Sequence, residues 1–215
     1  MIQREVLPEL LDTLPNEDPA AVTSRAELRL INRLMGNHRW VERRVRQLPP
    51  SRRRVLELGA GDGLLSRRLI QRGLCAEGEV NALDLAPQPC DWPLGARWQQ
   101  TDLFALPQLP EAEVVLANLF LHHFQKDQLA ELGRRLPSAC RVLIFSEPAR
   151  RRLHLWQGRL LSVIMRLGHV TRHDMLISIR AGFLHHELPH ALGLHGWQFK
   201  VSHTLLGAYR VYATR

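Results

Sequence analysis

The stretch Val55-Leu56-Glu57-Leu58-Gly59-Ala60-Gly61-Asp62-Gly63 decides the fold. Its first four residues form a short apolar run that is typical of a buried strand. Three glycines follow within five residues, and residues 64–72 then have the apolar spacing of a helix. Glycine is needed where a ligand lies against the backbone, because a Cβ atom would block it. The stretch therefore predicts a nucleotide-type ligand site at the carboxyl end of the first strand.

Two other glycine patterns do not fit this loop. Position 64 is Leu, so the dinucleotide spacing G-x-G-x-x-G fails, and no lysine follows as a phosphate loop would require. Asp84 gives a second signal, because it ends the predicted strand 80–84, 21 residues beyond Gly63. A carboxylate there can accept both hydroxyls of a ribose, whereas the ordinary alternative is a solvated acid at a strand end.

Strands and helices alternate along the rest of the chain. We predict strands at 54–58, 80–84, 96–101, 114–118 and 141–145, with helices at 64–72 and 125–136 between them. Helices at 153–167 and 187–194 follow, and strands 198–205 and 208–213 end the chain around a turn at Leu206-Gly207. This pattern predicts an α/β fold: a Rossmann-like, seven-stranded, mostly parallel sheet with a C-terminal antiparallel hairpin.

The first 50 residues differ from this pattern. Residues 1–20 are acidic and are expected to be loosely helical, and residues 21–54 form a basic amphipathic helical segment that breaks near Gly36. We therefore expect an N-terminal helical lid or extension at 1–50 and one structural unit at 51–215. Within that unit, residues 150–195 would form a helical insertion on the substrate side.

Composition restricts the class of protein. The 215 residues are 45% hydrophobic and 23% charged, which indicates a globular chain with an adequate core. Its three cysteines form no C-x-x-C pair and Met1–Glu5 do not resemble a secretory signal, so we expect a cytoplasmic protein. No apolar stretch approaches the ~20 residues needed to span a bilayer. The net charge of +8 comes almost entirely from arginine, since only Lys126 and Lys200 are lysines.

These motifs resemble the class I S-adenosylmethionine-dependent methyltransferases, clearly over residues 53–147 and, in its final hairpin, at the C-terminus. The resemblance implies S-adenosyl-L-methionine as cofactor. It implies that the methionine part of the cofactor contacts Glu57, Gly59, Ala60, Gly61 and Gly63. The ribose would be held by Asp84, beside Leu85, and the adenine amine would contact Asp102-Leu103. Asn118-Leu119 would pass beside the sulfonium.

The stretch Leu121-His122-His123-Phe124 resembles the Leu-His-His segment of small-molecule methyltransferases, including the ubiquinone and menaquinone type. That resemblance implies methyl transfer to an oxygen or carbon atom of a biosynthetic small molecule. In-line displacement needs chiefly alignment, and a general base helps only a poor nucleophile. The candidate bases are His122, His123, Glu147, His173 and Asp174.

Each candidate base has an ordinary structural alternative. The two adjacent histidines can simply pack and cap the next helix, and Glu147 can pair with Arg150 or Arg151. In His173-Asp174 the carboxylate could fix the tautomer of the imidazole, but adjacent side chains often point apart. None of the histidine spacings matches a known zinc motif, so no metal is predicted.

Three arginine clusters raise the question of an anionic partner: residues 43–46, 52–54 and 150–152. Only Arg150, Arg151 and Arg152 are expected at the carboxyl edge of the sheet, where they could meet an anionic acceptor, an acidic carrier protein or RNA phosphates. Asn118-Leu119-Phe120 replaces the Asn-Pro-Pro-Tyr type of motif used on nucleic-acid amino groups, so nucleic acid is disfavoured. An RNA methyltransferase remains the alternative. A non-catalytic interaction protein of this fold is the third hypothesis, against which the intact loop and Asp84 argue.

Overall fold

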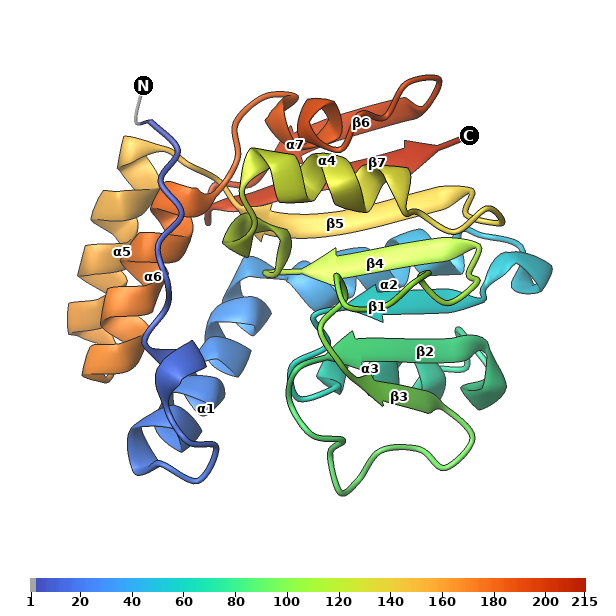
Figure 1. The fold of residues 1–215 in the computed structure, drawn as a ribbon. Coiled ribbons are helices and arrows are strands. Elements are labelled where there is room, and N and C mark those ends of the chain that lie inside the picture. The colour runs from blue at the N-terminus through green and yellow to red at the C-terminus, as the bar shows by residue number, and fades with distance from the viewer. Residues whose placement is uncertain (1–2) are drawn as a thin grey trace.

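A seven-stranded sheet forms the centre of the computed structural model, which describes residues 3–215 (Figure 1). The strand order is β3-β2-β1-β4-β5-β7-β6. The first five strands are parallel, and β7 pairs antiparallel with both β5 and β6. This confirms the predicted α/β architecture and its terminal hairpin. The strands are β1 (Val55–Leu58), β2 (Val80–Asp84), β3 (Arg97–Gln100), β4 (Val114–Asn118), β5 (Val142–Pro148), β6 (Gln198–His203) and β7 (Ala208–Thr214).

Helices cover both faces of the sheet, because the central strands are apolar on both sides. On one face, Leu129 and Leu132 of α4 join Leu188 of α7 over alternate strand residues such as Leu56. On the other face, residues of α2 and α3 pack over the intervening positions, such as Val55. Figure 1 shows α4 in front of the sheet and α2 and α3 behind it. The helices are α1 (Pro19–Met35), α2 (Asn37–Arg46), α3 (Leu64–Gln71), α4 (Lys126–Arg134), α5 (Arg152–Ile164), α6 (His169–Ala181) and α7 (Glu187–Ala191), with 3-10 turns at η1 (Leu11–Thr13), η2 (Pro50–Arg52), η3 (Glu77–Glu79) and η4 (Leu121–His123).

From β1 the chain adds β2 and β3 on one side, and then adds β4 and β5 on the other side. The strands β1 and β4 are therefore neighbours, although β2 and β3 separate them in sequence. Loops that leave such a pair at the carboxyl ends diverge to opposite faces and open a crevice. In Figure 1, α1, α5 and α6 lie beyond these carboxyl ends. Within residues 3–215, no helix is long and apolar enough to cross a bilayer.

Two segments differ from the sequence prediction. Residues 3–10 contain no helix, and only Leu11–Thr13 make a 3-10 turn before α1. The helix α6 was not predicted, because its buried residues (Val170, Thr171, Asp174, Ile177, Ile179 and Ala181) do not form one stripe. It contacts α1, α5, β5 and two 3-10 turns, so several faces are buried at once. Tertiary packing here outweighs a weak local pattern.

The contact between α4 and α7 gives a test of this packing. A Cβ atom on Gly133 would lie 1.8 Å from the carbonyl oxygen of Leu192, which is backbone and cannot rotate away. We expect Gly133→Ala to lower the free energy of unfolding by about 3 kcal/mol in chemical denaturation, since overpacking forces a backbone shift. The matched control is Gly78→Ala, where nothing lies within 4 Å of the new methyl group. Equal stability of the two variants would contradict this packing.

Candidate functional site

The glycine loop after β1 adopts backbone angles that only glycine takes readily. Gly59, Gly61 and Gly63 have φ values of 64°, 60° and 69°. A Cβ on Gly59 would lie 2.1 Å from the ring of Phe120, and one on Gly63 would lie 2.7 Å from the ring of Trp92, whereas nothing lies within 4 Å of one on Gly61. Gly59 and Gly63 thus allow the rings of Phe120 and Trp92 to pack against the loop, and Gly61 leaves open space for a ligand.

Asp84, at the end of β2, is joined directly to this loop. One carboxylate oxygen accepts the Gly61 N–H at 2.6 Å, and the other accepts the Ala86 N–H at 2.7 Å. Burial raises the pKa of Asp84, while these backbone donors oppose the rise. The loop and the acid were predicted as separate motifs, and the structure brings them into direct contact.

Glu57 lies beneath the loop and is almost fully buried. Its carboxylate accepts hydrogen bonds from both the backbone N–H and the hydroxyl of Ser66, in the first turns of α3. Burial raises the pKa of Glu57 to about 8, although the Ser66 bonds favour its charged form. A cation bound nearby would therefore stabilise the charged form of Glu57 and lower its pKa.

A cavity of about 1320 Å³ opens above these residues at the carboxyl edge of the sheet. Ligand pockets usually measure ~300–1,000 Å³, so this one has room for two ligands. It is lined by ten of the predicted cofactor residues, namely Glu57, Gly59, Ala60, Gly61, Asp84, Leu85, Asp102, Leu103, Asn118 and Leu119, whereas Gly63 lies outside its lining.

Asn118 at the end of β4 connects the cavity floor to α1. Its amide nitrogen donates to the side-chain oxygen of Asn32 at 3.1 Å. The following residue, Leu119, has φ 54°, a strained conformation for a branched side chain, and its N–H donates to Ser146. The turn after β4 is thus held in a special geometry beside the glycine loop. The sequence did not predict Asn32 as a site residue.

The segment of residues 4–14, here called the N-terminal strap, crosses the cavity and is fixed by polar contacts. Arg4 donates to the carbonyls of His122, Phe124 and Ala181 and stacks on the ring of Phe183. The strap thereby brings Glu9 and Asp12 into the cavity lining. Sequence reasoning missed both acids, because their partners lie more than 100 positions away.

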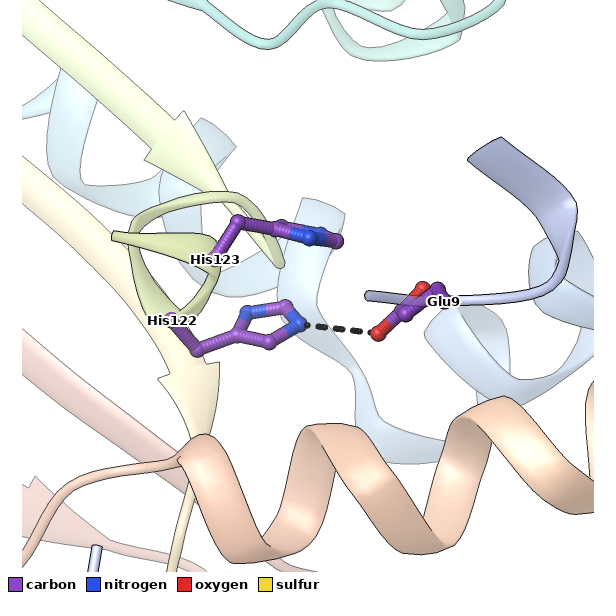
Figure 2. A group of neighbouring side chains, drawn as sticks. All are labelled: Glu9, His122 and His123. Atoms are coloured by element: carbon purple, nitrogen blue, oxygen red, sulfur yellow. Dashed lines mark ion pairs between the residues drawn. The ribbon is translucent and has the colours of Figure 1, made fainter. Parts of the chain in front are cut away.

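Figure 2 shows Glu9 facing His122 and His123. His122 is buried between two carboxylates: its Nδ1 lies 2.8 Å from Glu147 and its Nε2 lies 3.4 Å from Glu9. Burial alone would lower the pKa of His122, but the two acids raise it to about 9. Burial alone would raise the pKa of Glu9, but the two histidines, His122 above all, and the hydroxyl of Ser178 together lower it. We interpret the group as an imidazolium held by two carboxylates.

Ligand atoms of Glu9, His122 and His123 lie within 4.8 Å of one another, so the same group could hold a metal ion. A metal would have to displace the proton from His122, which the two carboxylates stabilise there. The proton alone accounts for the geometry.

His123 differs from its neighbour. Its ring is partly exposed to the cavity, and its Nδ1 lies 3.7 Å from Asp12. Burial and the charge of His122 lower the pKa of His123 to about 4, so it is neutral near pH 7. Desolvation by the cavity walls, together with Glu9 and Asp174, raises the pKa of Asp12 to about 6, although its side chain stays partly open to solvent.

The other candidate bases have structural partners. Glu147 does not pair with Arg150 or Arg151; it accepts the N–H groups of Phe120, Leu121 and His122 at the start of the turn after β4. Asp174 accepts the N–H groups of Leu10 and Leu11 at 2.8 and 2.9 Å and thus holds the strap. His173 contacts Asp174 at 2.9 Å, but neither residue lines the cavity.

The expected basic edge of the acceptor site needs correction. Arg150 is buried and donates hydrogen bonds to the Gly182 carbonyl and to the Glu187 carboxylate. These bonds connect the end of β5 to the start of α7. Arg151 and Arg152 are exposed, and none of the three lines the cavity. Among the charged residues of the cavity lining, seven acids outnumber two arginines, Arg25 and Arg29 of α1.

Comparison with solved structures identifies the fold. Plantazolicin methyltransferase BpumL, in complex with a triazolic desmethylPZN analog and SAH, superposes with a TM-score of 0.70 at 11% identity, over 95% of this chain and 93% of that chain. The pyocyanin biosynthetic protein PhzM gives 0.62 at 14% identity, over 97% and 62%. Human N-acetylserotonin methyltransferase, in complex with SAM, gives 0.56 at 18% identity, over 95% and 61%.

At such low identity these matches establish the fold alone, and the chain has the fold of S-adenosylmethionine-dependent methyltransferases. No protein-family model and no curated protein sequence matches the chain.

The protonation of His122 can be tested by NMR titration of its ring nitrogens. We expect a midpoint near pH 9 and a fall of at least about one pKa unit in Glu147→Gln, since that change removes the closer carboxylate. The raised pKa also means that this ion pair stabilises the fold fully below pH ~6.5 and loses its contribution as the pH rises toward 9. Glu131→Gln, on the exposed side of α4, should leave the midpoint unchanged. An ordinary midpoint near 6.5 would contradict the assignment.

Proposed function

We propose that this protein is an S-adenosylmethionine-dependent methyltransferase that acts on an oxygen or carbon atom of a small biosynthetic acceptor. The observation that carries the proposal is the contact between Gly61 and Asp84 at the floor of a cavity large enough for two ligands. Proteins of the same fold have been solved with SAM or SAH bound.

The residues around the loop fit the cofactor in chemistry. Asp84 would accept the ribose hydroxyls in exchange for the Gly61 N–H, and the open space at Gly61 would admit the methionine part. Asp102 and Leu103 would meet the adenine, and Asn118 and Leu119 would pass beside the sulfonium. Gly63 would act through the packing of Trp92. The buried Glu57 would become fully charged beside an ammonium group, since a nearby cation lowers the pKa of an acid.

S-adenosylmethionine, when bound, supplies a methyl group on a positively charged sulfur. The protein's part is to align an acceptor with that group and to exclude water. For a hydroxyl acceptor it must also remove a proton. His123 is neutral, faces the cavity and has Asp12 behind it, so this pair is the base that we assign.

The N-terminal 50 residues act in this proposal as a lid over the cavity, and residues 150–195 act as its substrate-side wall on the unit of residues 51–215. Because acids outnumber basic groups in the lining, an uncharged hydroxyl-bearing acceptor now fits better than an anion or a ligand presented by an acidic carrier. The free thiols of Cys75, Cys90 and Cys140 agree with a cytoplasmic location.

Calorimetry with S-adenosylmethionine tests the cofactor site. We expect binding by the wild-type chain and a loss of about 100-fold or more in Asp84→Ala, since two hydrogen bonds to a charged group are removed. Gly61→Val should abolish binding, because it fills the open space and strains the backbone. Glu111→Ala, on the exposed loop before β4, should bind like the wild type. A wild-type chain that does not bind would overturn the proposal.

The assignment of the base is tested with methyl-labelled cofactor and a small-molecule extract, by counting label in the organic phase. We expect His123→Ala to lose about 100-fold in turnover, the usual effect of removing a general base. His173→Ala should retain turnover, because His173 lies outside the cavity. Both variants should keep wild-type cofactor affinity. The reverse result would return the role to His173.

A further inference from the structure

The helix α5 leaves five of its large apolar side chains exposed. The residues that it buries are His154, Gly158 and Ser162, which offer little apolar area. Leu153, Trp156, Leu160, Val163 and Ile164 are between 43% and 70% exposed, and Leu160 and Ile164 stand at the edge next to the cavity. A soluble helix normally has the opposite arrangement, with large apolar residues directed toward the core. These exposed apolar side chains form a surface that residues 3–215 do not cover.

The hairpin between β6 and β7 extends this apolar surface. Leu205 and Leu206 at its tip are 84% and 59% exposed. The hairpin lies against α5, because a Cβ on Gly207 would lie 3.3 Å from the ring of His154. We call these seven apolar residues of α5 and the hairpin tip the α5 patch. Figure 1 places α5 at the outer edge of the molecule, beyond the carboxyl ends of the strands.

Arginines border the patch on the same helix. Arg152 and Arg159 lie along α5, Arg151 precedes it and Arg166 follows it, and all four are exposed. None of the four makes an ion pair with any residue from 3 to 215. Residues 149–186 contain seven arginines and a single acid, Asp174, which is buried against the strap. The patch thus combines exposed apolar groups, a tryptophan and positive charge that no acid offsets.

We infer that the α5 patch binds the surface of an anionic lipid bilayer. An amphipathic helix with arginines beside Trp and Leu lies in the plane of such a surface, its apolar face among the acyl chains and its charges at the headgroups. A symmetric dimer through α5 would bring the arginines of two copies together without acids between them. A nucleic acid would match the arginines but would leave the leucines and the tryptophan exposed.

The position of the patch connects it to the cavity. Leu160, Ile164 and Leu206 belong to the patch and also line the cavity, so its mouth opens beside the bound surface. In the methyltransferase proposed above, an amphiphilic acceptor could pass from the bilayer into the cavity. This last step rests on the proposed function, whereas binding to the bilayer does not.

Co-sedimentation of the full chain with vesicles tests the inference. We expect binding to vesicles of phosphatidylcholine mixed with phosphatidylglycerol and little binding to phosphatidylcholine alone. Trp156→Ser/Val163→Ser and Arg152→Glu/Arg159→Glu should each reduce the partition coefficient by about tenfold or more, because apolar burial and charge both contribute. All four side chains are exposed, so the variants should retain the wild-type melting temperature.

Matched controls distinguish binding by the α5 patch from nonspecific hydrophobic adsorption and from an effect of net charge. Leu94→Ser removes an exposed leucine in the loop before β3, and Arg43→Glu/Arg46→Glu reverses two exposed arginines on α2. Both should bind vesicles like the wild type. Equal loss in patch and control variants would overturn the inference. A chain that ignores vesicles but dimerises through Trp156 and Val163, or binds RNA through the arginines, would also overturn it. Calorimetry with S-adenosylmethionine remains independent of either outcome.

Discussion

The carboxylate of Glu147 organises the region where the strands meet the cavity. It lies fully buried at the end of β5 and accepts three successive backbone N–H groups from residues 120–122, as well as the imidazole of His122. A buried carboxylate without such partners would be strongly destabilising, so the turn after β4 is fixed by the need to satisfy it. That turn directs His122 toward Glu9 and His123 toward Asp12, and its carbonyls receive Arg4 of the strap.

Local sequence was sufficient to predict the parts of the site that local backbone geometry creates. The glycine loop and Asp84 follow from what a strand, a tight turn and a ligand against the backbone require, and the structure places them together. The residues of the strap could not be predicted in the same way. Glu9 and Asp12 occur in a short acidic segment without periodicity, and only the completed fold shows that His122 and His123 oppose them.

The arginines of residues 150–152 and the carboxylate of Asp174 differ from their predicted roles for a physical reason. The arginines of residues 150–152 adjoin the carboxyl edge in sequence, but Arg150 is needed to bind Glu187 and Gly182, and its two neighbours point to the outer surface. Asp174 was predicted as a candidate base, but its two oxygens accept hydrogen bonds from the backbone of the strap. In both cases hydrogen bonds within the fold occupy the side chain. The molecule is thus acidic within its cavity and basic on the outside of α5.

The strap also has a consequence for how the chain is made. Arg4, Glu9 and the backbone of Leu10 bind residues between 122 and 181, so the strap can take its position only after these later residues have been synthesised. Pairings of such long range form late, after the loop entropy of the intervening chain has been overcome. A partly synthesised chain therefore has its glycine loop and its first strands but no cover over them. The strap can cover the cavity only once α6, which carries Asp174, has been translated and folded.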